Sequence, residues 1–284
     1  MQYHQPVKLL SSRTKSETYF RALRWQGKRH CPACNFKRKL YALHEGRFQC
    51  ARCSFKFSDF SGTYLERLRI PFDELAHILY LFVLGVPSYR TRRYINTTLK
   101  TAQRLYLLFR QAIYDVCVQQ LTQIILDGEI EVDESMYGGH RRGKRGWGAA
   151  GKHIVFGMYQ RNGFVFTFPV PDRSISTLIP LVQEHSHAGS LYYSDDWHAY
   201  TRLSVKGDHV VIVKDKGVPR AKGRDHINGI EGFWSFSKNW LYQYRGIPQH
   251  HFPLYLKETE YRFNYRDKDL FLEIAKQVTQ TRYQ

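Results

Sequence analysis

Two closely spaced pairs of cysteines most strongly limit how the first part of this chain can fold. Each pair is a Cys-x-x-Cys turn, and fifteen residues separate the pairs. The four cysteines are Cys31, Cys34, Cys50 and Cys53. Four thiolates in two such turns suit one tetrahedral structural Zn²⁺ and leave no coordination position open for catalysis. We therefore predict a zinc ribbon over residues 26–60, with a β-hairpin formed by residues 39–43 and 48–49, which folds only with its metal.

Charge composition indicates the kind of partner. The chain has 284 residues, with 43 Lys and Arg against 25 Asp and Glu, so its formal net charge is +18. A folded chain this basic is expected to bind a polyanion, most simply nucleic acid. The longest apolar run, Ile78–Val86, is too short to cross a bilayer, and the first residues lack the apolar core of a signal peptide. We expect a cytoplasmic protein without a membrane partner, associated with the nucleoid if it is bacterial.

The remaining regions divide by their pattern. Residues 1–25 are expected to form a helical lead-in, and residues 61–120 a helical region. Cys117 lies in an apolar helical pattern and is expected to be a packed core thiol. Within the helical region, a helix, a turn containing glycine and a short helix over Tyr89–Ile95 resemble a helix-turn-helix. The short helix would carry three DNA-binding residues, Arg90, Arg92 and Arg93. A plain helical linker is the equally weighted alternative.

From residue 121 to residue 284 the chain alternates between strand and helix patterns. Strands are expected over 129–135, 153–159, 164–170, 190–195 and 209–213, and helices over 174–185, 197–203, 226–241 and 251–263. The Asn162-Gly163 pair predicts a hairpin between the second and third strands. Three strands, a helix, a strand, a helix and a strand is the order of a ribonuclease-H-like core. We therefore predict an α/β domain with a mixed five-stranded sheet and flanking helices.

Acidic residues occur at the ends of two of these strands and on a late helix. Asp133 lies near the end of the first strand, Asp195 ends the fourth, and Glu231 lies on the helix of 226–241. Lys238 follows Glu231 by seven residues, about two helical turns, and so falls on the same face. Three converging carboxylates with a lysine beside them are typical of two-metal phosphoryl transfer.

Taken together, these segments resemble a known family. The cysteine pairs, DGEIEVDESMYGG, KRGWGAAGK, GSLYYSDDWHAY, HINGIEGFWSFSK and YLKETEYRFNYR resemble the DDE transposases of bacterial insertion sequences, in the group with a zinc ribbon before a ribonuclease-H-like catalytic domain. The resemblance implies a catalytic triad of Asp133, Asp195 and Glu231 that holds two Mg²⁺ or Mn²⁺ ions, with Lys238 contacting DNA. It also implies double-stranded DNA partners, namely transposon ends and target DNA, and at least a homodimer.

Two of the triad assignments have rivals. Asn228 lies one turn before Glu231, and some members of this family are described with asparagine as the third residue. We favour Glu231 because a carboxylate binds a hard divalent ion better than an amide does. Asp196 rivals Asp195, and strand alternation from Leu191 favours Asp195.

Two basic loops flank the predicted strands. The loop of residues 140–152 is rich in glycine and is expected to clamp phosphate, with an indole that can stack on an unpaired base. A solvated hairpin tip is the alternative. Its candidate DNA contacts are Arg141, Arg142, Lys144, Arg145, Trp147 and Lys152. The second loop, residues 214–224, and the residues after it add Lys222, Arg224 and His226.

The sequence therefore predicts an insertion-sequence transposase that binds terminal inverted repeats and catalyses strand cleavage and strand transfer. One rival is a catalytically inactive, repurposed DNA-binding regulator. The other is a ribonuclease-H-like nuclease without strand transfer. Only the first of these three joins DNA strands.

Overall fold

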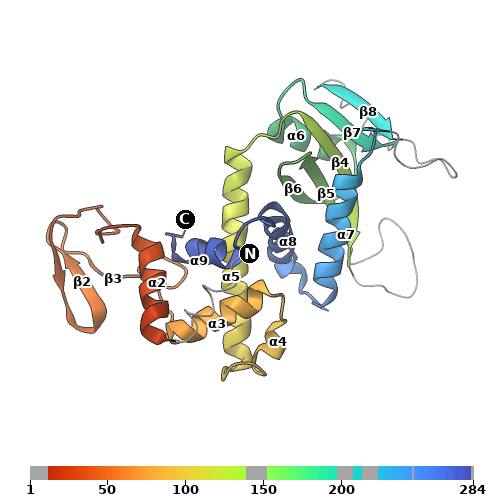
Figure 1. The fold of residues 1–284 in the computed structure, drawn as a ribbon. Coiled ribbons are helices and arrows are strands. Elements are labelled where there is room, and N and C mark those ends of the chain that lie inside the picture. The colour runs from red at the N-terminus through yellow and green to blue at the C-terminus, as the bar shows by residue number, and fades with distance from the viewer. Residues whose placement is uncertain (1–11, 139–151, 197–206, 213–222, 245, 283–284) are drawn as a thin grey trace. The chain divides into compact units, whose positions relative to one another are not determined.

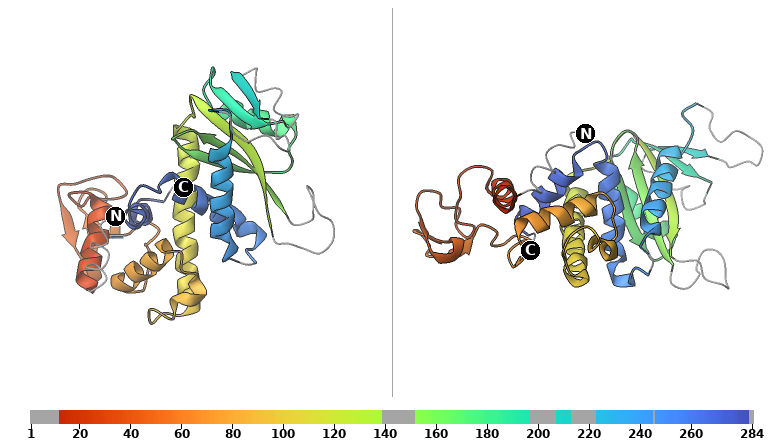
Figure 2. Two further views of the ribbon diagram at one scale, coloured as in Figure 1. Left: turned by 45° about the vertical axis from the view of Figure 1, so that its right-hand side comes forward. Right: turned by 60° about the horizontal axis from the view of Figure 1, so that its bottom comes forward.

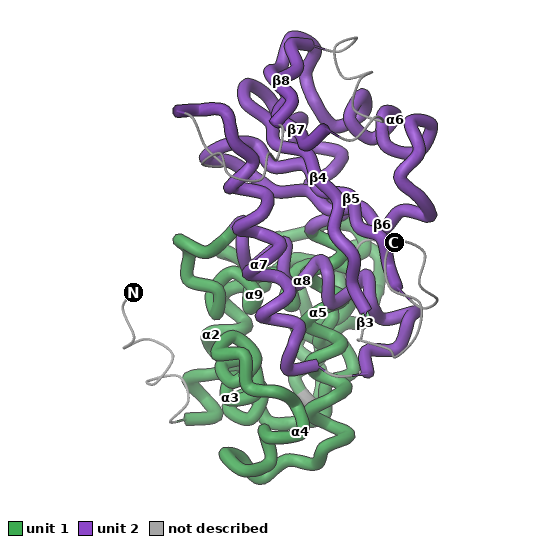
Figure 3. Tube along the Cα trace, turned by 90° about the vertical axis from the view of Figure 1, so that its right-hand side faces the viewer, with its two compact units in different colours: residues 1–116, 265–284 green, residues 117–264 purple. Residues whose placement is uncertain are grey.

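The computed structural model describes residues 12–138, 152–196, 207–212, 223–244 and 246–282. It divides into two compact units, Met1–Val116 with Tyr265–Gln284, and Cys117–Asn264 (Figure 3). Each unit is described separately below.

The first unit begins with a helix followed by a small sheet (Figures 1 and 2). The helix is α2 (Arg13–Trp25), and the antiparallel sheet has the order β1 (Leu40–Ala42), β2 (Arg47–Cys50), β3 (Lys56–Ser58), with a 3-10 turn at His44–Gly46. Asp59, which is 5% exposed, accepts hydrogen bonds from Trp25 Nε1 at 2.7 Å and Arg29 Nε at 2.6 Å. This buried carboxylate therefore ties the end of α2 to the sheet.

The other helices of this unit are α3 (Phe72–Val83), α4 (Ser88–Thr91), the first part of α5 (Leu99–Gln123), and α9 (Leu270–Thr279). The helix expected over Tyr89–Ile95 is wrong in extent, because α4 is a single turn that ends at Thr91. Threonine and isoleucine are branched at Cβ, and their frequency after residue 90 weakens helix formation. Far along the sequence, α9 packs against α2 and α3, and Arg282 N donates to Gly62 O at 2.9 Å.

The second unit is built on a mixed five-stranded sheet of order β6-β5-β4-β7-β8. Its strands are β4 (Glu129–Tyr137), β5 (His153–Gln160), β6 (Val165–Val170), β7 (Leu191–Asp195) and β8 (Asp208–Ile212). The first three are antiparallel neighbours, and β7 and β8 are added parallel to β4. Three antiparallel strands extended by two parallel ones confirm the predicted ribonuclease-H-like α/β fold. The predicted hairpin is also present, with Asn162 at φ +61°.

Alternation along the strands gives the sheet two apolar faces. One face, with Val132, Phe156 and Tyr192, packs on α6 (Ile175–His185). The opposite face, with Val155 and Tyr193, is covered by α7 (Asn228–Tyr242) and α8 (Phe252–Asn264), which follows a 3-10 turn at Gln249–His251 (Figure 1). The site residues considered below lie on this second face.

Side chains of α8 close the outer edge of β6. Val165 N donates to Asn264 Oδ1 at 2.8 Å, and Asn264 Nδ2 donates to Val165 O at 2.9 Å. Two residues on, Thr167 N donates to Glu260 Oε2 at 2.8 Å, and Lys257 Nζ donates to Thr167 O at 2.9 Å. An open strand edge would offer these groups to another chain, so α8 protects the sheet from edge-to-edge pairing.

Asn264→Ala is expected to lower the free energy of unfolding by about 1–3 kcal/mol, because it leaves a buried backbone donor and acceptor without partners. The matched control is Asn239→Ala on the exposed side of α7, which should change stability by less than about 0.5 kcal/mol. Urea unfolding followed by tryptophan fluorescence measures both. Equal midpoints for the two variants would show that the side chains of α8 do not stabilise this edge.

Candidate active site and zinc ribbon

The pairing of β4 with β7 brings two of the predicted acids to neighbouring positions. Glu131 pairs with Tyr193 in a parallel register, and the same register continued by two residues sets Asp133 beside Asp195. Tyr193 packs in the apolar cluster under α7, so Asp195, two residues further, belongs to the face that α7 covers. Asp196 follows the last residue of β7 and is exposed.

Helix α7 runs along β4 in the same direction as the strand (Figures 1 and 2). Three hydrogen bonds connect α7 to residues on one face of β4. Ile230 N donates to Glu131 Oε2 at 2.8 Å and Trp234 Nε1 donates to Asp133 Oδ2 at 3.1 Å. Near the end of the strand, Tyr137 OH bonds Ser237 Oγ at 2.9 Å. The carboxylate of Asp133 is therefore oriented by an indole of the helix that carries Glu231.

The rotation of α7 about its axis decides which of its polar residues approach the acids. Ile230 and Phe233 are buried, and Phe233 packs on Phe263 of α8, on one side of the helix. Glu231 and Lys238 are about 20° apart around the axis, on the other side. Asn228 is about 160° from Ile230 and is exposed.

Lys238 lies near both Asp133 and Tyr137. Its Nζ is 5.9 Å from the centre of the Tyr137 ring. Partial burial lowers the pKa of Lys238, and the negative charge of Asp133 opposes that shift. Lys238, which the sequence predicts on the same helical face as Glu231, therefore lies near Asp133.

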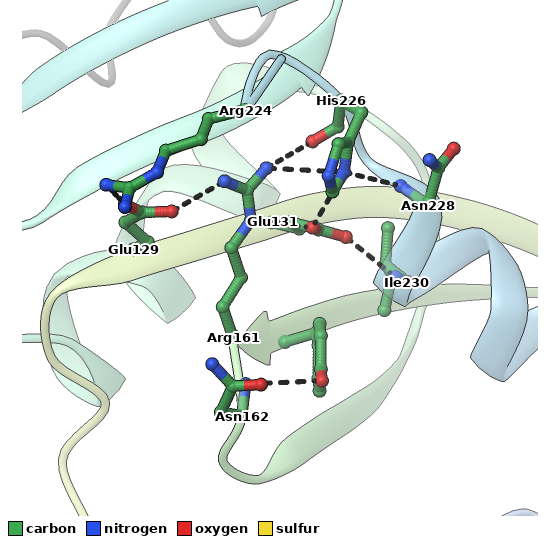
Figure 4. Close-up of polar contacts among 9 residues, drawn as sticks. Glu129, Glu131, Arg161, Asn162, Arg224, His226, Asn228 and Ile230 are labelled. Atoms are coloured by element: carbon green, nitrogen blue, oxygen red, sulfur yellow. Dashed lines mark hydrogen bonds and ion pairs between the residues drawn. The ribbon is translucent and has the colours of Figure 1, made fainter. Parts of the chain in front are cut away.

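A second polar cluster lies next to these acids (Figure 4), and its members Glu129, Glu131 and Arg161 were not predicted as site residues, although His226 and Arg224 were predicted to contact DNA. Glu131 is 1% exposed and its Oε1 accepts from Arg161 Nε at 2.8 Å. Arg161 also bonds Glu129 Oε2 at 2.5 Å and His226 O at 2.5 Å. Burial lowers the pKa of Arg161, but its bonds to Glu131 and Glu129 outweigh this and raise it. The only sequence signal was the alternation of acids along β4.

The predicted DNA contacts are distributed over several parts of the chain. Arg90, Arg92 and Arg93 are exposed at α4 and in the turn after it, and Arg224 is exposed with its NH1 3.7 Å from Glu129 Oε1. His226 is half-buried, with Nδ1 3.6 Å from Glu131 Oε1, and Lys152 precedes β5. The other predicted contacts lie outside the described residues: Arg141, Arg142, Lys144, Arg145, Trp147 and Lys222.

The cysteine pairs form two turns of the same conformation. Asn35 N donates to Cys31 O at 2.8 Å and Ser54 N donates to Cys50 O at 3.0 Å, and both donors have positive φ, +56° and +57°. The sulfur atoms of Cys31 and Cys53 are 3.6 Å apart, as are those of Cys34 and Cys50. Tetrahedral zinc with bonds of about 2.3 Å separates its sulfur ligands by about 3.8 Å.

All four sulfur atoms lie within 4.8 Å of one another. Among the residues that the structure describes, these four cysteines form the group of potential metal ligands with such close spacing. The arrangement fits one structural Zn²⁺. Cys117, by contrast, is fully buried in the second unit, where burial raises the pKa of its thiol well above the usual value.

Comparisons with known proteins match both parts of the chain in which these residues lie. Residues 125–264 match the family model of the ISXO2-like transposase domain, and residues 14–55 match that of the transposase zinc-ribbon domain. A Haemophilus influenzae protein described as an uncharacterized transposase-like protein is 36% identical over 115 residues, 40% of this chain and 92% of that protein. No helix within the described residues has the length and apolar character needed to cross a membrane.

Two solved structures are similar at a much lower level. One is the Mos1 strand transfer complex, with 10% identity and a TM-score of 0.21 over 74% of this chain and 78% of that one. The other is a pre-cleavage Mos1 transpososome, with 8% identity and a TM-score of 0.20 over 74% and 79%. Scores this low add no weight to the fold derived from the strand order.

Cys50→Ser is expected to abolish zinc binding and unfold the ribbon, because four thiolates hold the ion and a sheet this small folds with its metal. The control Cys117→Ser should retain one zinc ion per chain. Zinc content by elemental analysis and amide exchange over residues 31–58 measure the two effects. Zinc retained in Cys50→Ser, or lost without faster exchange, would contradict a structural role.

Proposed function

The chain belongs to the ISXO2-like transposase family, and from that premise we propose that it binds the ends of a mobile DNA element and catalyses metal-dependent strand cleavage and strand transfer. The observation that supports this proposal is the pairing of Glu131 with Tyr193 between β4 and β7, because the same register continued by two residues would bring Asp133 beside Asp195 on the face covered by α7. Glu231 and Lys238 lie on one side of that helix.

The side chains at this position suit divalent cations. Asp133, Asp195 and Glu231 supply carboxylate oxygens, the ligands that Mg²⁺ and Mn²⁺ prefer. Two such ions would polarise the scissile phosphate and lower the pKa of the attacking water or DNA 3′-hydroxyl. Trp234 Nε1 donates to one oxygen of Asp133 and so orients this carboxylate.

Glu231 is favoured over Asn228 as the third ligand because of the rotation of α7. Asn228 is exposed, whereas Glu231 is half-buried and lies on the same side of the helix as Lys238, whose charge interacts with Asp133. Asp195 is favoured over Asp196 because it is the last residue of β7 and shares the face of Tyr193.

Lys238 then acts as a phosphate contact. It donates hydrogen bonds without accepting any and lies beside the acids, so a DNA backbone entering the site can replace water around its ammonium group. The basic residues of the ribbon, of α4 with the turn after it, and of the two loops are proposed to bind the duplex on either side of the cut. Since two ends must be joined, the active form is proposed to be at least a homodimer, acting on DNA in the cytoplasm.

The decisive experiment is cleavage and joining of labelled DNA that carries the element's own end. Asp133→Asn, Asp195→Asn and Glu231→Gln should each lose about 10²-fold to 10³-fold in rate, because metal ions supply several kcal/mol of transition-state stabilisation. All three should still bind the DNA. The matched controls Asp196→Asn and Asn228→Ala should cut and join within a few-fold of the wild type.

Each other outcome selects a different function. Wild-type protein that binds the end but does not cut it with Mg²⁺ or Mn²⁺ would be a DNA-binding regulator. Cutting without joining would indicate a nuclease without strand transfer. Loss of activity in Asn228→Ala but not in Glu231→Gln would show that the third metal ligand is Asn228 and not Glu231.

A further inference from the structure

Arg161 contacts the two strands that carry Asp133 and Asp195 and the segment that leads into α7, the helix of Glu231. It follows β5 in the hairpin turn, and its side chain is 13% exposed. Its Nε bonds Glu131 of β4 at 2.8 Å, and its guanidinium carbon lies 3.8 Å from the centre of the Tyr193 ring of β7. Its NH2 donates at 2.5 Å to the carbonyl of His226, just before α7 (Figure 4).

Each of these contacts is close in sequence to a proposed metal ligand. Glu131 precedes Asp133 by two residues, and Tyr193 precedes Asp195 by two residues. A two-residue step along a strand is about 7 Å and returns to the same face. His226 lies five residues before Glu231. Arg161 therefore contacts β4 and β7 two residues before Asp133 and Asp195, and the chain five residues before Glu231.

Glu131 adds a direct link to the helix. While Oε1 takes the bond from Arg161, Oε2 accepts from Ile230 N, the residue before Glu231, at 2.8 Å. Gly229 leaves room for this bond, because a Cβ there would lie 2.9 Å from the same carboxylate oxygen. This hydrogen bond therefore fixes the position of the first turn of α7 along β4.

The ion pair between Arg161 and Glu131 is difficult to separate. Arginine presents a planar fork that makes several fixed hydrogen bonds and stacks on an aromatic ring, which the single ammonium group of lysine cannot reproduce. With Glu131 at 1% exposure, separating the pair would leave a buried charge uncompensated. A small shift of β4, β7 or α7 is therefore opposed by all the contacts together.

We propose that Arg161 and Glu131 are positioning residues that hold β4, β7 and the start of α7 in the register that lets Asp133, Asp195 and Glu231 share metal ions. The pair acts through the acids and touches neither substrate nor metal. This proposal rests on the function proposed above. It predicts that loosening the pair weakens metal binding more than it weakens DNA binding.

The chain offers a matched control at the other end of α7. Arg262 of α8 is 3% exposed, its Nε bonds Glu258 Oε1 at 2.9 Å, and its guanidinium carbon lies 4.1 Å from the centre of the Trp240 ring. This pair has the same chemistry as Arg161, Glu131 and Tyr193, and these two contacts lie on α7 and α8. Arg161→Lys and Arg262→Lys should therefore destabilise the protein for the same reason.

The test compares Mn²⁺ binding by the zinc-loaded full chain, measured by electron paramagnetic resonance, with the Mn²⁺ concentration that gives half-maximal DNA cleavage. Arg161→Lys should raise both values by about 10-fold or more, the usual effect of removing the groups that support metal ligands. Arg262→Lys should leave both within about 2-fold, and DNA affinity should be unchanged in both variants. Equal Mn²⁺ values in the two arginine variants would overturn the proposal.

If Arg161→Lys does not fold, a second pair of variants tests the positioning role. Glu131→Gln keeps an acceptor for Ile230 N but weakens the bond to Arg161, whereas Glu129→Gln alters a bond to the same arginine without touching α7. Amide exchange at Ile230 and Glu231 should quicken in Glu131→Gln and remain unchanged in Glu129→Gln. Equal exchange in these two variants would also overturn the proposal.

Failure of the proposed function gives a different result. If Asp133→Asn binds Mn²⁺ as tightly as the wild type, the acids do not form the metal site, whatever the exchange rates show. If Asp133→Asn loses Mn²⁺ while Arg161→Lys keeps it, the metal site stands and the positioning role is excluded.

Discussion

The close approach of α7 to the sheet is the constraint on which the rest of the catalytic unit depends. A Cβ at Gly157 of β5 would lie 2.5 Å from the Trp234 ring, and one at Gly229 would overlap the ring of Tyr159. Both positions therefore bring backbone against a side chain at distances that only glycine permits. If the helix stood further from the strands, Trp234 could not reach Asp133, nor could Ile230 N reach Glu131. Because Gly157 and Gly229 have no side chain, α7 can approach the sheet closely enough to form these hydrogen bonds.

Buried polar groups then fix where α7 lies along and across the sheet. Tyr137 OH bonds Ser237 Oγ, and Ser237 Oγ bonds Thr259 Oγ1, so a chain of hydroxyl groups runs from β4 through α7 to α8. Apolar side chains alone would tolerate sliding of one helix against the other, because their attraction is not directional. Hydrogen bonds in a dry interior tolerate it far less, since each displaced group would remain unpaired. The apolar cores hold the layers together, and the polar contacts select one arrangement.

Most of the catalytic unit could be predicted from the sequence because its signals are local. Alternation along Glu129–Tyr137, the Asn162-Gly163 turn and the apolar spacing of α7 each arise from neighbouring residues, and the elements appear where these patterns indicate. The packing of α9 on α2 and α3 could not be predicted in this way, because it joins segments about 250 and about 200 residues apart in the sequence and depends on which apolar surfaces match. The extent of α4 was predicted wrongly because a helix this short is only marginally stable, so the Cβ-branched residues after residue 90 are enough to end it.

Glu131 and Asp133 show where a sequence pattern stops being informative. Both are acids on one strand, they point to the same face, and alternation alone treats them alike. Their neighbours separate them: Glu131 is enclosed by Arg161 and the start of α7, whereas Asp133 is half-buried, with Lys238 and the indole of Trp234 nearby. An enclosed carboxylate with an arginine partner is already neutralised and cannot bind a metal ion without losing that pair. This difference agrees with the roles proposed for the two acids, support for Glu131 and ligation for Asp133. The arginine that distinguishes them lies 28 residues beyond Asp133, in a turn whose Asn-Gly pair predicts the hairpin but not the partner of Arg161.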